Sequence, residues 1–280
     1  MWSNYHTHSD YCDGKGTLQD YVETAEKNGV RQIGFSSHAP LPFPCKWCMK
    51  VEAFPQYLRE IESARTSFPG LEVYKGLEAD YIPGITSPSD FASALDYTIG
   101  SIHFVGSFDR QYWEIDNTFE VFREGLSKIF KGDIRAAISA YYNLTRDMIV
   151  SSPPDILGHM DKIKINALGR FFDESETWYI LEVEKLLNTI REAKVIVEVN
   201  TRGLYKKKSD TTYPSPWILE RILGLDIPIT FSSDAHHPDD LIKEFRTIHA
   251  LLTDIGFKSV EVLKNGVWEK MPLNVYGPGR

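Results

Sequence analysis

The chain has few cysteines and no obvious membrane or export signal. Cys12, Cys45 and Cys48 make an odd set, and although Cys45 and Cys48 have metal-knuckle spacing, no second pair completes a four-sulfur site. We therefore interpret all three as reduced thiols, with a redox role as the alternative. No apolar run is long enough to span a bilayer, and the N-terminus lacks a basic-then-apolar signal pattern. We expect a cytoplasmic protein with no membrane partner.

Basic residues are also in deficit. The 31 Lys and Arg residues against 39 Asp and Glu give a formal net charge of -8. A general nucleic-acid surface needs a basic stripe, so this balance argues against a nucleic-acid partner. A small phosphorylated substrate stays compatible, because bound metal ions supply local positive charge. The hydrophobic content of 42% is ordinary for a globular protein with a large core.

Hydrophobic periodicity predicts a repeating strand-then-helix order along the chain. The expected strands are 3–8, 32–37, 72–81, 97–102, 155–159, 195–200 and 228–233. The expected helices are 17–28, 51–67, 88–94, 118–151 with a break near Gly132, 174–194, 214–223 and 238–254. Segments 39–48, 104–117 and 202–208 are expected to be loops, and 258–268 a terminal hairpin-like piece.

Seven strand–helix units with short connections and no low-complexity linker predict an α/β fold with a closed parallel sheet. The length of 280 residues suits one such barrel, which needs about 250 residues. We expect a single domain over residues 1–280.

His6 and His8 are the first residues suited to a metal ion. Alternate side chains of a strand point to the same side, so the two imidazoles can face one point, and Asp13 follows on a short turn closed by Gly14. Imidazole and carboxylate are the usual ligands of zinc, iron or manganese. An isolated His-x-His pair is more often two polar residues on a strand edge, so the prediction depends on the rest of the chain.

The other candidate ligands fall at the carboxyl ends of other predicted strands. A closed parallel barrel gathers these ends on one face, where barrel enzymes have their active sites. A chance distribution would have to place six of the eight histidines there. We predict metal binding by His6, His8, Asp13, His38, Glu78, His103, His159, Asp234 and His236. This set exceeds the roughly four to six ligands of one ion, which favours several bridged ions and hydrolysis of a phosphate ester.

These motifs resemble those of the polymerase-and-histidinol-phosphatase (PHP) superfamily. The similarity covers essentially the whole chain and is carried by 6–8, 36–38, 76–78, 100–103, 158–161 and 232–236. Within that superfamily, the chain length, the sequence at 198–201 and the long loop after His38 are most similar to the stand-alone histidinol-phosphate phosphatases. The resemblance implies a distorted (β/α)7 TIM-like barrel with a trinuclear cluster of divalent zinc, iron or manganese at the carboxyl ends of the strands.

The resemblance also distributes the ligands among three ions. It implies His6, His8, Glu78 and Asp234 for the first ion, a bridging Glu78 with His103 and His159 for the second, and Asp13, His38 and His236 for the third. Many relatives have a histidine where this chain has Asp13.

The implied enzyme is a phosphoric monoester hydrolase of histidine biosynthesis. It would hydrolyse L-histidinol phosphate to L-histidinol and inorganic phosphate by attack of a metal-bridging hydroxide. Lys164 and Arg202 are the expected phosphate contacts, with a solvated basic turn as the alternative for Lys164. The general acid is expected among four residues: His236, His237, Asp109 and Asp116.

Two other functions stay open at this stage. One is a PHP phosphoesterase that acts on another phosphomonoester or on nucleotides, and the other is a metal-binding or interaction module that has lost catalysis. The oligomeric state does not follow from the sequence.

Overall fold

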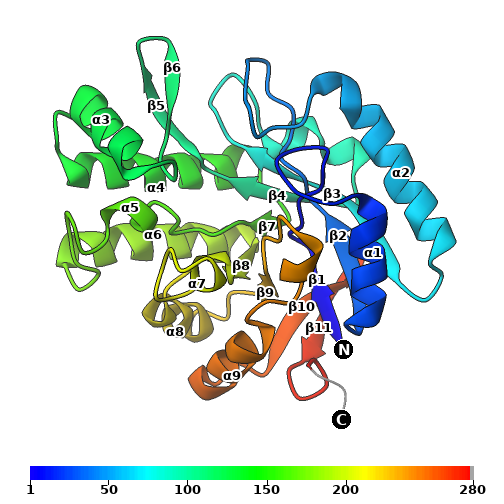
Figure 1. Ribbon diagram of the computed structural model, residues 1–280. Helices are drawn as coiled ribbons and strands as arrows, with labels where there is room; N and C mark the ends of the chain where they lie inside the picture. Colours follow the sequence, from blue (N-terminus) through cyan, green and yellow to red (C-terminus); the bar gives the residue numbers. More distant parts are fainter. Residues whose placement is uncertain (278–280) are drawn as a thin grey trace.

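Seven parallel strands form the centre of the molecule in a computed structural model that describes residues 1–277 (Figure 1). They follow the order β1-β2-β3-β4-β7-β8-β9. Their bounds are β1 (Trp2–Asn4), β2 (Val30–Phe35), β3 (Glu72–Asp80), β4 (Tyr97–Ser101), β7 (Ile156–Leu157), β8 (Ile196–Asn200) and β9 (Ile229–Ser232). All seven predicted strands are therefore confirmed, although β1 and β7 are shorter than expected.

The first and last strands meet just beyond their carboxyl ends. Thr7 forms a parallel bridge with Ala235, the N–H of His8 donates to the Ala235 carbonyl (2.8 Å), and the N–H of Ala235 donates to the His6 carbonyl (3.1 Å). The barrel is thus nearly closed, and the segments that close it carry predicted ligands.

Helices surround the sheet, with α1 and α2 on one side and α3 to α6 on the other (Figure 1). Their bounds are α1 (Leu18–Lys27), α2 (Phe54–Ser67), α3 (Phe119–Phe130), α4 (Ile134–Ser151), α5 (Lys164–Ala167), α6 (Thr177–Ala193), α7 (Arg202–Tyr205), α8 (Pro216–Gly224) and α9 (Phe245–Ile255). Thr17 begins α1 with a capping box that pairs it with Asp20. The expected break near Gly132 is confirmed, because Lys131 and Gly132 take positive φ and Asp133 caps α4. No helix within residues 1–277 is both long and apolar enough to cross a membrane.

Three predicted segments differ in the structure. Segment 104–117 contains a hairpin of β5 (Phe104–Phe108) and β6 (Gln111–Glu114), because Asp109 and Arg110 form a tight turn with positive φ between two aromatic runs. The basic segment after β8 starts with α7 rather than as a loop. The last predicted helix is split into a 3-10 turn, Pro238–Asp240, and α9, because Glu244 between them adopts a left-handed conformation.

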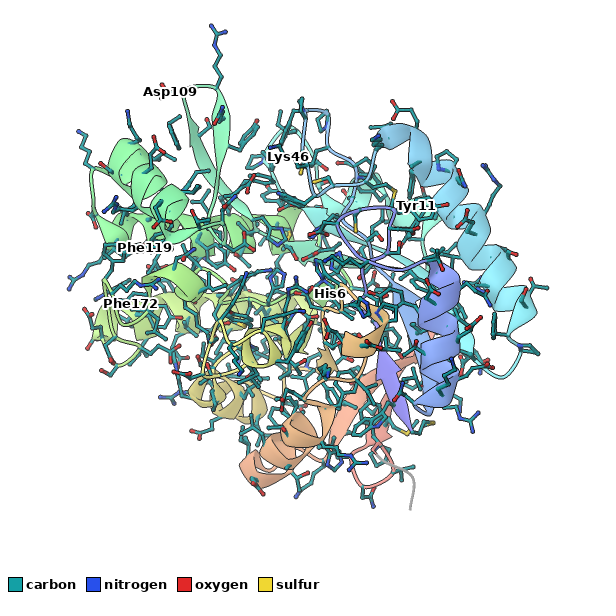
Figure 2. The ribbon with its side chains drawn as sticks, viewed as in Figure 1. His6, Tyr11, Lys46, Asp109, Phe119 and Phe172 are labelled. Atoms are coloured by element: carbon teal, nitrogen blue, oxygen red, sulfur yellow. The ribbon has the colours of Figure 1, made fainter. Side chains whose placement is uncertain are left out.

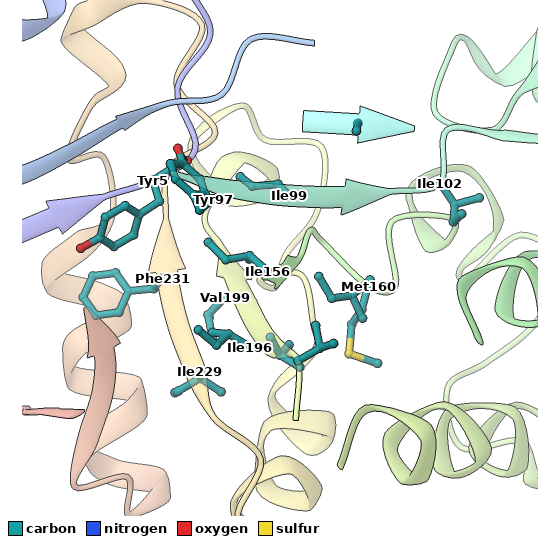
Figure 3. Packing of buried hydrophobic residues seen from close by; sticks show 14 of the residues in the cluster. Tyr5, Tyr97, Ile99, Ile102, Ile156, Met160, Ile196, Val199, Ile229 and Phe231 are labelled. Carbon is teal, nitrogen blue, oxygen red and sulfur yellow. Dashed lines mark hydrogen bonds between the residues drawn. The ribbon is translucent and has the colours of Figure 1, made fainter. Parts of the chain in front are cut away.

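The apolar core lies beneath the carboxyl ends of the strands. Buried residues of the strands and of the adjoining segments pack there, among them Tyr5, Ile99, Val199 and Phe231 (Figure 3). The Tyr5 hydroxyl bonds the backbone of Leu263 in β10 (Ser259–Lys264), which pairs with β11 (Val267–Pro272) in the expected terminal hairpin. The core thereby fixes the strands whose ends carry the polar residues.

Candidate metal centre

His6 and His8 follow β1 and face two carboxylates. Both rings are fully buried. The His6 Nε2 atom lies 3.2 Å from Glu78 Oε2 and 3.8 Å from Asp234 Oδ1. The His8 Nε2 atom lies 3.5 Å and 3.3 Å from the same two oxygens. Because Glu78 is in β3 and Asp234 follows β9, the barrel brings these four side chains together from three separate parts of the chain.

Glu78 is at the centre of the cluster. Its Oε1 atom lies 2.8 Å from His159 Nε2 and 3.7 Å from His103 Nε2. Its Oε2 atom lies 2.9 Å from His38 Nδ1. One buried carboxylate therefore faces imidazoles on both of its oxygens, which is the geometry of a bridging ligand.

A third group lies at the mouth of the cluster. The Asp13 Oδ1 atom is 3.3 Å from His236 Nε2 and 3.8 Å from His38 Nε2. The His8 ring stacks on the His236 ring with centroids 3.9 Å apart. Possible ligand atoms of these four residues lie within 4.8 Å of one another.

All nine predicted ligands lie in at least one group of possible ligand atoms this close together. The groups overlap more than the family resemblance implies. His8 joins the group of Asp13, and His159 lies with His6 and Asp234 rather than only near Glu78. The distribution of the ligands among individual ions is therefore a matter for proposal below.

Two of the predicted ligands have an unusual backbone. Asp234 and His159 adopt φ angles of 51° and 21°, which non-glycine residues rarely take. Such conformations cost on the order of 1–3 kcal/mol and occur mostly at functional sites. At His159 the N–H donates to Glu198 Oε2 (2.8 Å), and this bond supports the strained residue.

Two acidic residues behind the cluster orient its histidines. Glu198 Oε1 lies 2.6 Å from His6 Nδ1, and Asp80 Oδ1 lies 3.0 Å from His103 Nδ1. Carboxylates in such positions fix the ring and its tautomer. The sequence prediction assigned neither residue a role. The sequence did contain a signal for Glu198, because it is a charged residue within an otherwise apolar strand. A parallel strand is buried on both faces, so such a carboxylate must have a polar partner inside the protein.

The donor atoms that face the centre fit a metal ion. Donation of Nδ1–H to Glu198 leaves Nε2 of His6 with a lone pair directed at the carboxylates, and Asp80 has the same effect on His103. Within residues 1–277, three buried Nε2 atoms have no hydrogen-bond partner: those of His6, His8 and His103. Unsatisfied nitrogens beside ionised carboxylates form the donor set of zinc, iron or manganese.

The cluster keeps its carboxylates ionised. Burial raises the pKa of Glu78, but without a metal ion the protonated imidazoles of His6 and His38 outweigh burial and hold the pKa well below its ordinary value. Burial is likewise outweighed at Asp234, where His6 and Arg202 hold the pKa well below its ordinary value. Both residues are therefore acceptors for a cation.

A cavity of about 220 Å³ lies above the cluster. Its walls include Asp234 and His236 from the cluster, together with Lys162, Arg202 and Asp116. Arg202 Nη1 lies 2.6 Å from His236 Nδ1 and donates to the Asp234 carbonyl (2.7 Å). Lys162 Nζ lies 3.2 Å from Asp116 Oδ2. Arg202 is thus where the sequence prediction expects a phosphate contact.

The structure does not bring Lys164 to this cavity. Lys164 is buried, and its ammonium donates to Asp161 Oδ2 (2.8 Å), to the Thr212 carbonyl (2.9 Å) and to Ser215. Lys162 lines the cavity in its place, and Lys208 lines it as well. The chain enters a helical turn after β7, and residues two apart in a helical turn point to opposite sides.

The four candidate acids occupy different places. Asp109 is exposed at the tip of the β5–β6 hairpin, far from His6 in Figure 2. His237 is half-exposed, and its Nδ1 accepts the N–H of Asp239. His236 and Asp116 line the cavity. Only these last two are therefore placed to contact a substrate there.

The nearly closed parallel barrel, with its histidine–carboxylate cluster at the strand ends, defines an α/β barrel protein with a candidate metal centre. The family model for the PHP domain matches residues 4–202, and the chain belongs to the PHP domain family. The chain is similar to the histidinol-phosphatase of Bacillus subtilis strain 168, with 31% identity over 256 residues that cover 84% of this chain and 94% of that protein.

Two solved structures share the fold. A Listeria monocytogenes protein assigned as histidinol phosphatase hisK aligns with a TM-score of 0.79 at 22% identity. The alignment covers 88% of this chain and 99% of the Listeria monocytogenes chain. The histidinol phosphate phosphatase of Lactococcus lactis, solved with zinc, L-histidinol and phosphate, aligns with a TM-score of 0.72 at 19% identity. The alignment covers 96% of this chain and 99% of the Lactococcus lactis chain. The expected (β/α)7 type of barrel is thereby confirmed.

Proposed function

We propose that this protein is a metal-dependent phosphatase that hydrolyses L-histidinol phosphate to L-histidinol and inorganic phosphate. The observation that supports it most is one cavity that joins the nine-residue cluster to the cations Lys162 and Arg202. Both features stabilise the negative charge of a phosphate ester as it is hydrolysed, and the similar Bacillus subtilis protein is named for this reaction. We further propose that residues 1–280 act as one domain.

The nine ligands would hold a trinuclear divalent cluster. We assign Glu78 as the bridge, since it contacts His38, His103 and His159 through its two oxygens. Bound there, the ions supply Lewis acidity and a water-derived nucleophile at neutral pH. Glu198 and Asp80 hold the imidazoles in the tautomer that ligation requires.

The cations of the cavity bind the phosphate group in this proposal. Arg202 offers a planar fork of donors beside Asp234, and Lys162 offers a point charge in the same cavity. Lys162 also holds Asp116, so an arriving phosphate would share this ammonium with a carboxylate. Positioning and charge neutralisation are the main contributions that a protein makes to phosphoryl transfer.

Asp116 is better suited to bind a cation than to donate a proton. Burial raises its pKa, but Lys162 and His103 outweigh burial and bring the pKa to about 2. The carboxylate is therefore ionised at neutral pH, and with Glu114 it gives the cavity an acidic wall that suits the ammonium of histidinol. His236 is also an unsuitable acid, because Arg202 and Asp13 contact its two nitrogens. We therefore assign proton delivery to water in the cavity.

A phosphate-release assay tests the proposal. The purified protein is given L-histidinol phosphate beside a panel of other phosphomonoesters and a dinucleotide. We expect a clear preference for L-histidinol phosphate. Equal rates across the panel would favour the alternative, a PHP phosphoesterase of broad or nucleotide specificity.

A matched pair of variants tests the site. His236→Ala should abolish phosphate release, because it removes a ligand at the mouth of the cluster. His237→Ala, at the neighbouring half-exposed position, should retain it. Equal loss in both variants would contradict the assignment of His236 to the cluster and return His237 to the site.

A further inference from the structure

Cys45 and Cys48 lie side by side on the loop between β2 and α2. Both are partly buried free thiols, and the chain bends over residues 46–48. Both side chains pack against the same small buried cluster, which consists of Leu41, Ile82 and Phe104. Neither residue has a part in the proposed phosphatase chemistry.

The residue between them contacts the metal centre. The Trp47 ring meets His38 edge-on with centroids 4.5 Å apart and meets His103 at 5.4 Å. It also stacks on Phe104, with centroids 5.5 Å apart, and lines the cavity. A change of backbone between the two cysteines therefore moves a wall of the candidate active site.

The two thiols differ in their surroundings. The Cys48 thiol lowers the pKa of Cys45 by its hydrogen bond, against the effect of burial, and the N–H groups of Trp47 and Cys48 lower it further. Burial and the adjacent Cys45 sulfur raise the pKa of Cys48. A Cys-x-x-Cys pair with one stabilised thiolate is typical of thiol–disulfide exchange.

We propose that Cys45 and Cys48 form a reversible disulfide that switches the shape of the cavity through Trp47. The oxidant is a low-molecular-weight disulfide. The Cys45 thiolate attacks one sulfur of this disulfide, whose S–S bond breaks to release one thiolate. Cys48 then loses its proton to solvent and attacks the Cys45 sulfur, which releases the second thiolate. Two protein thiols are oxidised, and one small disulfide is reduced to two thiols.

Cys12 is the natural internal comparison. It has no second cysteine at Cys-x-x-Cys spacing, and its sulfur lies 3.5 Å from His8 Nδ1. We therefore expect Cys12 to remain outside the disulfide when the same oxidant is added.

Peptide mapping tests the pairing without reference to activity. The intact protein is incubated with glutathione disulfide, remaining thiols are alkylated, and the protein is digested with trypsin without reduction. The exposed Lys46 lies between the two cysteines (Figure 2), so cleavage there leaves two peptides that only a Cys45–Cys48 disulfide holds together. We expect this linked pair and alkylated Cys12. A linkage through Cys12, or alkylation of all three cysteines, would overturn the proposal.

Single variants test the order of attack. Cys48→Ser should accumulate a mixed disulfide with glutathione at Cys45, because the second attack is lost. Cys45→Ser should react more slowly than Cys48→Ser, on the order of tenfold. Equal rates for the two variants would overturn the assignment of Cys45 as the attacking thiol.

The effect on the cavity rests on the proposed function. Phosphate release should change by roughly tenfold on oxidation and return after reduction with dithiothreitol, and the Cys45→Ser/Cys48→Ser double variant should not respond to the oxidant. A mapped disulfide with unchanged phosphate release would overturn the coupling through Trp47. Absence of phosphate release from the reduced protein would instead refute the proposed function, and the peptide map would still decide the pairing.

Discussion

Replacement of Glu198 by glutamine removes a buried charge while it preserves volume, directly behind His6. Glu198 accepts three hydrogen bonds: from His6 Nδ1 (2.6 Å) on one oxygen, and from the His159 N–H (2.8 Å) and Asn200 Nδ2 (3.1 Å) on the other. A glutamine has only one acceptor oxygen. If the glutamine oxygen accepts from the His159 N–H and Asn200, the glutamine NH₂ group faces His6. The His6 Nδ1 atom must then accept a hydrogen bond, so the ring proton moves to Nε2 and blocks binding of a metal ion there.

The opposite rotation of the amide keeps the His6 tautomer but places an NH₂ group against two donors. Either outcome weakens the site. Mutations of such outer partners cost roughly 10–100-fold in metal affinity, or about 1.4–2.7 kcal/mol. We expect a loss of this size in Glu198→Gln, with less loss of phosphate release when metal is saturating.

Competition with a chelator measures the affinity, and circular dichroism verifies the fold. Glu182→Gln is the matched control, since Glu182 of α6 is also largely buried but pairs with Arg146 of α4 and Lys185 of α6, away from the cluster. A folded Glu198→Gln protein with the metal affinity of the control would refute the role assigned to Glu198.

Three other predictions concern the cavity wall and the core. Lys162→Met should leave the protein folded and raise KM by about tenfold or more in the phosphate-release assay. Lys164→Met should lower the free energy of unfolding in urea titration by roughly 3–5 kcal/mol, because it leaves the buried Asp161 carboxylate without its cation. The reverse pattern would contradict the assignment of Lys162, rather than Lys164, to the cavity. Gly76→Ala should cost roughly 1–3 kcal/mol of stability, since its Cβ would lie 2.3 Å from Tyr97 Cζ, and an unchanged urea midpoint would count against this packing. The pKa of Asp116 is lower in the folded protein than in the unfolded chain, so this carboxylate stabilises the fold above about pH 4 and loses that effect as the pH falls toward 2. The difference in the free energy of unfolding between wild type and Asp116→Asn should therefore shrink over that range. A constant difference would refute the pairing of Asp116 with Lys162.

The parts of the site that follow from strand periodicity were predictable from the sequence. His6 and His8 are two apart beyond β1, and Asp234 and His236 are two apart beyond β9, so the parallel order of the sheet was enough to bring them to one face. The apolar strands also predicted the nearly closed barrel.

The parts that depend on turns and on partners distant in the sequence were not predictable. Lys162 and Lys164 are both plausible in a list of residues, and only the direction of the helical turn after β7 decides which one lines the cavity. The role of Glu198 requires knowledge of which ring lies above it, a contact across 192 residues. Asp109 lies outside the cavity because the hairpin of β5 and β6 carries it away from the barrel, as Figure 2 shows.

The central claim is that the cluster holds several transition-metal ions and that phosphate release depends on them. Elemental analysis of the purified protein, before and after chelation and paired with the phosphate-release assay on L-histidinol phosphate, tests this claim most directly. We predict more than one transition-metal equivalent per chain, loss of metal and activity together in the chelated protein, and recovery of both when metal is restored. A folded protein that releases phosphate from L-histidinol phosphate at its full rate without any transition metal would contradict the account.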